Sequence, residues 1–349
     1  MRNPAYLLAP PGATASLSSW LMRAVLIVNP TATTITPATR DLVTHALRSR
    51  LELTVVHTTH HGHGEELGRQ AAADGVDLVI VHGGDGTVNG VVNGMLGHPS
   101  TFDADAARRL PALAAVPGGS ANVLVRSLGI ANDPTVATNQ LIDIVDQYRR
   151  RPTWRRIGLI DCGERWALVN AGLGVDAEVV AAVEAHRTRG AKLTPVRYWR
   201  EAIPVSLSFS RRPPNLTLEL PGRDPIDGVH FAWVSNSSPW TYSNTRPMVT
   251  NPGCHFNTGL GLFAVDDMKV LPTLKLLRQL LAARPNPKAP QLIRDDNIAW
   301  VRVGTMTGPA ACQADGDYLG MRESMTFRAV PDALAVAAPP DQNAPTKTL

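Results

Sequence analysis

A glycine-rich turn that carries one carboxylate is the part of this sequence best suited to chemistry. Residues 77–82 (DLVIVH) form a short apolar run typical of a buried parallel strand, and GGDG at 83–86 follows directly. Glycine has no Cβ, so such a turn lets backbone N–H groups approach an anion closely. From Thr87 the pattern TVNGVVNGML predicts a helix, whose free N-terminal N–H groups also favour negative charge. We therefore expect a phosphate site.

Asp85 is the one acidic residue of this turn. A carboxylate beside a phosphate is repulsive unless a cation lies between them, so Asp85 indicates a nucleotide bound with Mg²⁺. Taken alone, the same four residues are equally compatible with a tight turn in which the Asp caps a helix.

A second joint of the same kind follows within the same half of the chain. Residues 112–116 read as a strand, PGG at 117–119 as its turn and SANVL at 120–124 as a helix start with Ser120 as the N-cap. The carboxyl ends of parallel strands meet at one sheet edge, so both joints could face one crevice. Neither joint has a following Gly-Lys-Ser/Thr or the G-x-G-x-x-G spacing, which weakens the P-loop and dinucleotide interpretations.

In these motifs the chain resembles the diacylglycerol kinase-like lipid kinases, a family that includes sphingosine kinases and bacterial lipid kinases. VLIVNP at 25–30 is similar to the family's opening strand and Asn-Pro turn, GGDGTVN at 83–89 to its nucleotide signature and PGGSANVLVRSLGI at 117–130 to its second phosphate loop. VNAGLGVDAEVV at 169–180 and Asp-Gly-Asp at 315–317 resemble landmarks of its substrate domain. The resemblance implies a nucleotide-binding α/β domain, then a β-sandwich that receives a lipid, with a cleft between them.

Hydrophobic periodicity agrees with this fold class, an open parallel α/β sheet followed by a β-sandwich. The first half predicts strands at 24–29, 53–58, 77–82 and 112–116. It also predicts three helices: one at 37–50 capped by Thr36, one that follows Gly62-His63-Gly64 and ends near residue 73, and one at 134–148. The second half predicts strands at 156–160, 166–170, 216–220, 229–235, 260–265, 298–303, 325–330 and 333–337, and helices at 177–184, 198–203 and 271–281. The expected domains are a nucleotide-binding domain at 23–150 and a lipid-substrate domain at 151–337. Residues 1–22 are expected to be a disordered extension, or else a misassigned start with Met22 as the true first residue. Residues 338–349 are expected to be a disordered tail.

A kinase needs a cradle for the triphosphate, a cation and a base beside the acceptor hydroxyl. The resemblance implies nucleotide contacts from Asn29, Thr58, Gly83, Gly84, Asp85, Gly86, Thr87, Asn89, Gly118, Gly119, Ser120 and Asn122. It implies catalytic roles for Asp85, the metal ligand, and for Asp317, the base, which stands where the family has Glu. Asp is one methylene shorter, and misplacement by about 1 Å costs roughly a hundredfold in rate. Taken alone, Asp-Gly-Asp is also ordinary turn chemistry.

Several family carboxylates are missing from this chain. Val123, Gly90 and Gly158 stand at positions that are often acidic, although Asp161 lies close to the last of them, and the family's Asp-Asp-Gly metal turn reads NTG at 257–259. Asp85 is left as the main Mg²⁺ ligand, which is workable because Mg²⁺ keeps several waters and phosphate oxygens. These losses motivate an alternative function, a nucleotide- or lipid-binding regulator without catalysis. A third candidate is NAD kinase, which shares GGDG-type turns.

Composition adds mild constraints. The formal charge of +4 and the pI of about 9.1 suit an anionic membrane or a nucleotide and are too weak to indicate nucleic acid. Three distant cysteines, Cys162, Cys254 and Cys312, suggest no disulfide framework and a reducing cytoplasm, and no apolar run is long enough to span a bilayer. We expect a cytoplasmic protein that associates peripherally with membranes; a homodimer remains one option for its oligomeric state.

Three further groups of side chains have two interpretations each. The histidines at 57, 60, 61 and 63 have a spacing that permits zinc or nickel, although an adenine-side or solvated loop is favoured there. The basic residues between 186 and 200, with Tyr198 and Trp199, suit a membrane-facing rim or a solvated helix face. Trp233, Trp240 and Tyr242 suit the sandwich core or a lipid cleft rather than a nucleic-acid platform. The function predicted is ATP-dependent phosphorylation of a lipid hydroxyl, with diacylglycerol as acceptor and phosphatidic acid as product.

Overall fold

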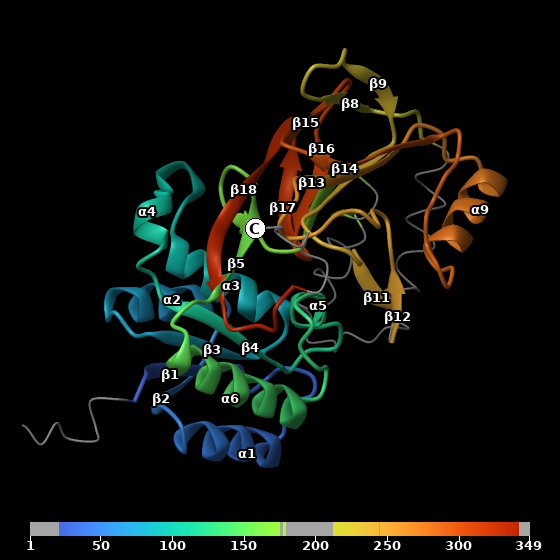
Figure 1. Cartoon of the computed structure of the whole chain (residues 1–349). Coiled ribbons are helices and arrows are strands. Elements are labelled where there is room, and N and C mark those ends of the chain that lie inside the picture. Colours follow the sequence, from blue (N-terminus) through green and yellow to red (C-terminus); the bar gives the residue numbers. More distant parts are fainter. Residues whose placement is uncertain (1–20, 175–176, 179–211, 244, 342–349) are drawn as a thin grey trace, which may run out of the picture.

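The computed structural model describes residues 21–174, 177–178, 212–243 and 245–341. It has a helix-covered α/β half, in the lower part of Figure 1, and an antiparallel β half, in the upper part. This arrangement confirms the predicted fold class of a mixed α/β domain joined to an antiparallel one.

The α/β half is built on four parallel strands in the order β2-β1-β3-β4. Its elements are β1 (Arg23–Val28), α1 (Pro37–Arg48), β2 (Glu52–His57), α2 (His63–Ala73), β3 (Leu78–Gly83), α3 (Asp85–Leu96), α4 (Ala104–Ala107), β4 (Ala112–Pro117), α5 (Val123–Ser127) and α6 (Pro134–Arg150), with a 3-10 turn at Pro99–Thr101. Every residue of β3 and β4 is buried, because helices cover both faces of the sheet. One core lies under α1 and α6, and the other under α2, α3 and α5.

The helix starts follow the local sequence signals closely. Thr36 caps α1 in a capping box with Thr39, with Pro37 as the first helical residue, as predicted. Asp133 caps α6 by accepting the N–H groups of Thr135 and Val136, each at 2.9 Å. In contrast, α3 begins at Asp85, two residues before the start expected at Thr87, because Gly84 takes the cap position.

The antiparallel half is a sandwich. Its elements are β5 (Arg155–Asp161), β6 (Trp166–Ala167), β7 (Asn170–Leu173), β8 (Leu216–Glu219), β9 (Ile226–Val229), β10 (Phe231–Ser235), β11 (Thr241–Ser243), β12 (Arg246–Met248), β13 (Leu260–Val265), α9 (Val270–Leu280), β14 (Leu292–Ile298), β15 (Trp300–Thr305), β16 (Ala310–Ala314), β17 (Asp317–Arg322) and β18 (Ser324–Val336). The six-stranded sheet β14-β13-β10-β7-β16-β17 packs on the antiparallel part of the first sheet. Their shared core includes Val234 and Leu262 from one sheet and Leu218 and Phe327 from the other.

Strand β18 connects the two halves. It pairs antiparallel with β15 near its start, and at its end Val336 pairs parallel with Leu113 of β4. Ala335 and Ala337 lie in the core of the α/β half. The strands predicted separately at 325–330 and 333–337 are therefore one strand, interrupted by a register shift beside Asp332, whose φ is 50°.

Other sequence predictions have different outcomes. The strand expected at 298–303 is divided between β14 and β15, and the strands β16 and β17 were not foreseen. The helix expected at 177–184 lies mostly outside the described residues, and the helix at 198–203 and the basic residues at 186–200 lie entirely outside them. All three cysteines are buried and unbonded, and among the described helices none is long and apolar enough to cross a membrane.

Candidate active site

The two glycine turns touch each other at the carboxyl edge of the sheet. The N–H of Gly118 donates to the carbonyl of Gly83 at 2.9 Å. A Cβ added to Gly119 would lie 2.7 Å from Cα of Gly84, and one added to Gly118 would lie 3.0 Å from Cα of Gly83. Only glycine fits such an approach, so the strand–turn–helix joints after β3 and β4 form one surface, as their position predicted.

Asp85 joins the first turn to the helix after the second. Its Oδ1 accepts the backbone N–H of Leu124 at 3.2 Å, so the carboxylate lies at the N-terminus of α5. Burial raises the pKa of Asp85, and hydrogen bonds from backbone N–H groups, first of Val123 and Leu124, oppose that rise. The carboxylate therefore replaces the missing cap of a helix that begins on another turn.

The prediction that Ser120 caps this helix is wrong. Helix α5 begins at Val123, and its cap residue Asn122 has a φ of 48° and makes no capping bond with its side chain. That side chain instead closes the loop, with Oδ1 accepting the N–H of Gly119 and Nδ2 donating to the Gly119 carbonyl, both at 2.8 Å. Ser120, in the same loop, is exposed.

The other predicted nucleotide residues follow the same edge. Backbone hydrogen bonds continue past the ends of β1 and β2. The N–H of Asn29 donates to the His82 carbonyl at 3.0 Å, and the N–H of Thr58 donates to the Val28 carbonyl at 2.9 Å. The side chain of Asn29 donates to Oγ1 of Thr87 at 2.9 Å. Residues from four consecutive joints of the sheet thus share one edge.

Two of the predicted contact residues are buried rather than open to a ligand. Asn122 is 3% exposed and Asn89 is 1% exposed. Nδ2 of Asn89 donates to the Trp166 carbonyl at 3.0 Å and to Oδ2 of Asp315 at 2.7 Å. Its side chain therefore ties α3 to the antiparallel half.

Asp315 opens the opposite wall of the crevice. It has a φ of 49°, and its carboxylate accepts the N–H groups of three consecutive residues, Leu168 at 2.6 Å, Val169 at 2.9 Å and Asn170 at 3.0 Å. Burial raises the pKa of Asp315, and these hydrogen bonds oppose the rise. Together with Asn89, this network fixes the 315–317 turn against α3.

Asp317 faces the first glycine turn. Its Oδ1 lies 4.0 Å from the position that a Cβ on Gly86 would take. Its Oδ2 lies 3.2 Å from Nη2 of Arg165, which also donates to Oδ1 of Asn89. Sequence reasoning missed Arg165, which belongs to no motif and reaches the crevice only because the β5–β6 hairpin folds over α3.

The described residues fit a nucleotide better than a protein-only metal cage. They contain no group of three His, Cys, Asp or Glu side chains that could hold an ion, which also removes support for zinc or nickel at the histidines. A side chain at Gly158 has no space, because its Cβ would lie 2.9 Å from the Phe256 carbonyl. Asp161 instead accepts the N–H of Gly163 at 2.6 Å. Of the predicted metal ligands, Asp85 could still hold Mg²⁺, with phosphate oxygens and water completing the shell of the ion.

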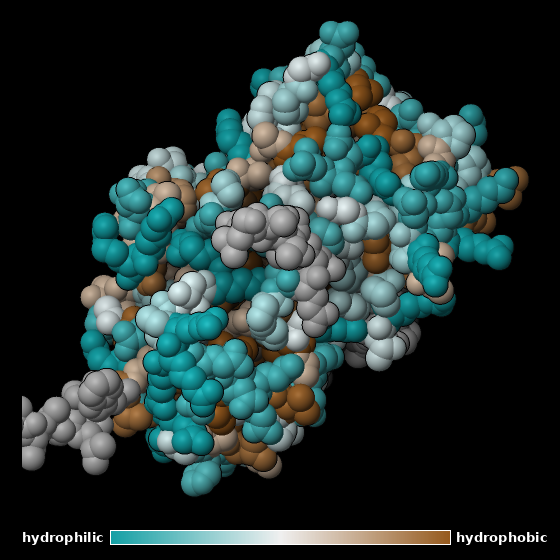
Figure 2. Space-filling model, in the orientation of Figure 1, coloured by the Kyte–Doolittle hydropathy of each residue, from teal (hydrophilic) through white to brown (hydrophobic). Residues whose placement is uncertain are grey.

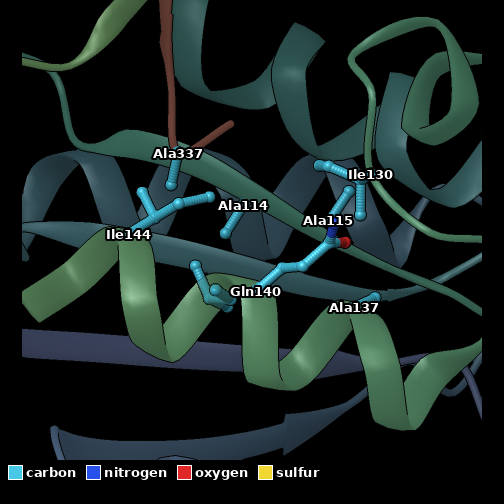
Figure 3. Close-up of a pocket in the computed structure, with 8 residues that line it drawn as sticks. Ala114, Ala115, Ile130, Ala137, Gln140, Ile144 and Ala337 are labelled. Atoms are coloured by element: carbon cyan, nitrogen blue, oxygen red, sulfur yellow. The ribbon is translucent and has the colours of Figure 1, made fainter. Parts of the chain in front are cut away.

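A narrow gap elsewhere in the α/β half, too small to hold a water molecule, has a different character. Figure 3 shows it between β4 and α6, lined by small apolar side chains such as Ala114, Ala137 and Ile144. Its one polar lining residue, Gln140, accepts the N–H of Ala131 at 2.9 Å. This gap is part of the core packing and carries no reaction chemistry.

Comparison with known proteins agrees with the geometry. Residues 23–148 match the diacylglycerol kinase catalytic domain. A Chromohalobacter salexigens protein named "Probable lipid kinase YegS-like" is 36% identical over 98 residues, which cover 28% of this chain and 29% of that protein. Sphingoid long chain base kinase 5 of Saccharomyces cerevisiae is 30% identical over 118 residues, 34% of this chain and 16% of that protein. These matches span less than a third of the relatives' length.

Solved structures extend the likeness to the whole fold. A crystal structure of diacylglycerol kinases from Bacillus anthracis str. Sterne has a TM-score of 0.65 at 16% identity, covering 91% of this chain and 97% of that one. A second structure from the same strain has a TM-score of 0.69 at 18% identity, covering 91% and 98%. At these identities the likeness concerns the fold.

Proposed function

Because the chain belongs to the diacylglycerol kinase catalytic domain family through residues 23–148, we propose that it is an ATP-dependent lipid kinase. It transfers the γ-phosphoryl group to a lipid hydroxyl, with diacylglycerol as the expected acceptor and phosphatidic acid as the product. It works at the surface of a membrane from the cytoplasm, where ATP is present.

The two turns supply the cradle. The first N–H groups of α3 have no partner within the helix, and the helix dipole favours negative charge at the same point. Glycines at 83, 84, 118 and 119 let the two turns pack closely, because added Cβ atoms would come within 2.7 to 3.3 Å of neighbouring atoms. Backbone N–H groups of both turns would then face one anion. Bound Mg²⁺, held through Asp85, would neutralise charge on the phosphate oxygens.

Asp317 is the general base in this proposal. A carboxylate within hydrogen-bonding reach of the acceptor hydroxyl takes its proton as the oxygen attacks phosphorus. Arg165, 3.2 Å from Asp317, holds this carboxylate in one position. Asn89 holds Arg165 in turn, through a hydrogen bond to the guanidinium.

The observation that carries the proposal is the distance across the crevice. Asp317 Oδ1 lies 4.0 Å from the Cβ position of Gly86, so the acid of the antiparallel half and the glycine turn of the α/β half face one another. A phosphate at the turn and a hydroxyl at Asp317 would then be neighbours, which is the geometry that phosphoryl transfer requires.

The test uses the purified full-length chain with labelled ATP, Mg²⁺ and mixed micelles that contain diacylglycerol, monoacylglycerol or a sphingoid base. We expect labelled phosphatidic acid from diacylglycerol, and none from the Asp85→Asn variant. The same assay also tests the two alternative functions. Labelled NADP formed from NAD would identify a NAD kinase, and nucleotide binding without transfer to any acceptor would identify a regulator.

A further inference from the structure

Helix α9 exposes three large apolar side chains on one side. Val270 is 58% exposed, Leu271 72% and Leu274 56%, a spacing that places them near one another on the helix surface. Leu276 and Leu280, each 4% exposed, face the protein instead. The helix therefore has two apolar faces, and the described residues of the protein cover only one of them.

The sequence around this helix is strongly basic. Residues 268–294 contain six of the 34 basic residues of the chain and none of its 30 acidic ones, so the rest of the chain is slightly acidic. The basic residues are Lys269, Lys275, Arg278, Arg284, Lys288 and Arg294. Lys269 and Arg294 pair with acids just outside the segment, Asp267 at 2.9 Å and Asp296 at 3.5 Å. The segment thus carries a local positive excess between the acids at 266–267 and those at 295–296.

The surface view shows exposed apolar atoms beside polar ones in this region. In Figure 2 brown apolar atoms at the right-hand edge, where Figure 1 places α9, are bordered by teal polar ones. Exposed apolar side chains within a basic border are the pattern of a helix that lies in the interface of an anionic bilayer.

The covered face of α9 leads toward the candidate active site. Leu276 and Leu280 pack on a cluster that includes Phe231, Phe263 and the stacked rings of Trp233 and Trp240, whose centroids are 4.4 Å apart. The Trp240 carbonyl accepts Nδ2 of Asn170 at 3.1 Å. The N–H of Asn170 in turn donates to Asp315, two residues before Asp317. An apolar cluster thus separates the exposed face of α9 from the proposed base.

We propose that α9 is a docking helix for anionic membranes, with Val270, Leu271 and Leu274 inserted among the lipids and the basic residues of 268–294 at the headgroups. This inference rests on the proposed lipid kinase function and adds the surface by which the enzyme reaches its substrate. A second copy of this chain is a poorer occupant, because two identical basic faces repel each other.

The test is sedimentation with vesicles of phosphatidylcholine, with or without phosphatidylglycerol. We expect the full-length chain to bind the anionic vesicles. The affinity of the Leu271→Ser/Leu274→Ser variant for these vesicles should be lower by at least about tenfold, because the variant lacks apolar surface that inserts into the bilayer. In Lys275→Gln/Arg278→Gln, each lost positive charge should weaken binding about fivefold, the equivalent of about 1 kcal/mol. Added salt should weaken the wild-type interaction as well.

A matched control lies on the far half of the molecule. Leu42 of α1 is 46% exposed, and Leu42→Ser should bind vesicles like the wild type. Unchanged binding of the α9 variants would overturn the proposal, as would a wild-type dimer that Leu271→Ser/Leu274→Ser converts to a monomer. Activity separates this inference from the kinase proposal: on a short-chain, water-soluble diacylglycerol the α9 variants should keep wild-type rates. If neither the wild type nor the variants phosphorylate a lipid, the kinase proposal fails, but the vesicle experiment still tests whether α9 binds membranes.

Discussion

The two walls of the crevice hold their carboxylates in contrasting ways. In the α/β half, the carboxylate of Asp85, which is also the proposed ligand of Mg²⁺, accepts backbone N–H groups at the start of α5. In the antiparallel half, Asp315 does the same with three N–H groups of residues 168–170, whereas Asp317 lies two residues further on, 27% exposed and paired with Arg165. Asp85 and Asp315 are therefore alike in accepting backbone N–H groups, whereas Asp317 pairs with a charged side chain.

This difference separates structural roles from chemical ones. A buried acid that accepts several backbone N–H groups fixes one segment against another, and its loss is expressed in stability. A half-exposed acid with one cationic partner is able to exchange a proton with a substrate. Substitutions of Asp315 and of Asp317 should thus affect different measurements, stability for Asp315 and activity for Asp317.

The largest effect is expected at Asp317. Asp317→Asn keeps the shape of the side chain and removes its basicity, so the rate of phosphoryl transfer should fall about 100- to 10,000-fold. The thermal midpoint should stay close to that of the wild type, because the side chain is partly exposed. Asp317→Glu is the matched variant and should retain much more activity than Asp317→Asn. Equal rates for wild type and Asp317→Asn would remove the distinction between the chemical role of Asp317 and the structural role of Asp315.

Asp315 should respond in the opposite way. Asp315→Ala leaves the N–H groups of 168–170 and the amide of Asn89 without their acceptor, which should lower the free energy of unfolding by about 3 kcal/mol. Asp315→Asn keeps one acceptor oxygen and tolerates the φ of 49°, so its loss should be smaller. Chemical denaturation measures both, and a stable Asp315→Ala would contradict the structural role.

The contact between the glycine turns can be tested without touching an acid. A methyl group at position 119 meets Gly84 Cα at 2.7 Å, so Gly119→Ala should destabilise the protein by about 1–3 kcal/mol and raise KM for ATP as the turns separate. In Gly304→Ala the added Cβ meets nothing within 4 Å, so this variant is the control and should change neither quantity. Wild-type KM for ATP in Gly119→Ala would show that the turns do not act together.

The smallest effect is a pH dependence at Asp85. Burial raises its pKa above the ordinary 3.8, so the folded protein favours the protonated form. The stability contributed by this group is fully present below pH 3.8 and is lost as the pH rises through the folded pKa. Asp85→Asn keeps an acceptor oxygen without the charge, and should therefore be more stable than wild type at neutral pH, with the difference disappearing in acid. Thermal midpoints across pH give the sign, and a variant less stable at neutral pH would contradict it.

The sequence predicted the α/β half well because its signals are local. Thr36-Pro37 and Asp133-Pro134 cap their helices through residues two or three positions away, and the apolar runs of β3 and β4 follow from a sheet covered on both faces. The meeting of the two glycine turns was also predictable, since consecutive parallel strands end at one edge.

What escaped prediction depends on contacts between distant residues. The cap of α5 comes from Asp85, 39 positions before Leu124, so no local pattern could have shown that Ser120 is not the cap. Asp315 is held by residues 145 to 147 positions away, and Arg165 reaches Asp317 only after the two halves have packed. The strands on either side of the 315–317 turn, β16 and β17, lack a clear apolar alternation, and their pairing with β7 and each other defines them instead.

The most direct test of the account is a crystal structure of the full-length chain with Mg²⁺ and a non-hydrolysable ATP analogue. We predict that the terminal phosphate lies against residues 84–87 and 118–120, with Mg²⁺ on Asp85 and the Asp317 carboxylate facing the γ-phosphate across the crevice. A triphosphate bound at these turns with Asp317 directed away from it, or bound elsewhere on the chain, would contradict the claim that the two walls form one active site.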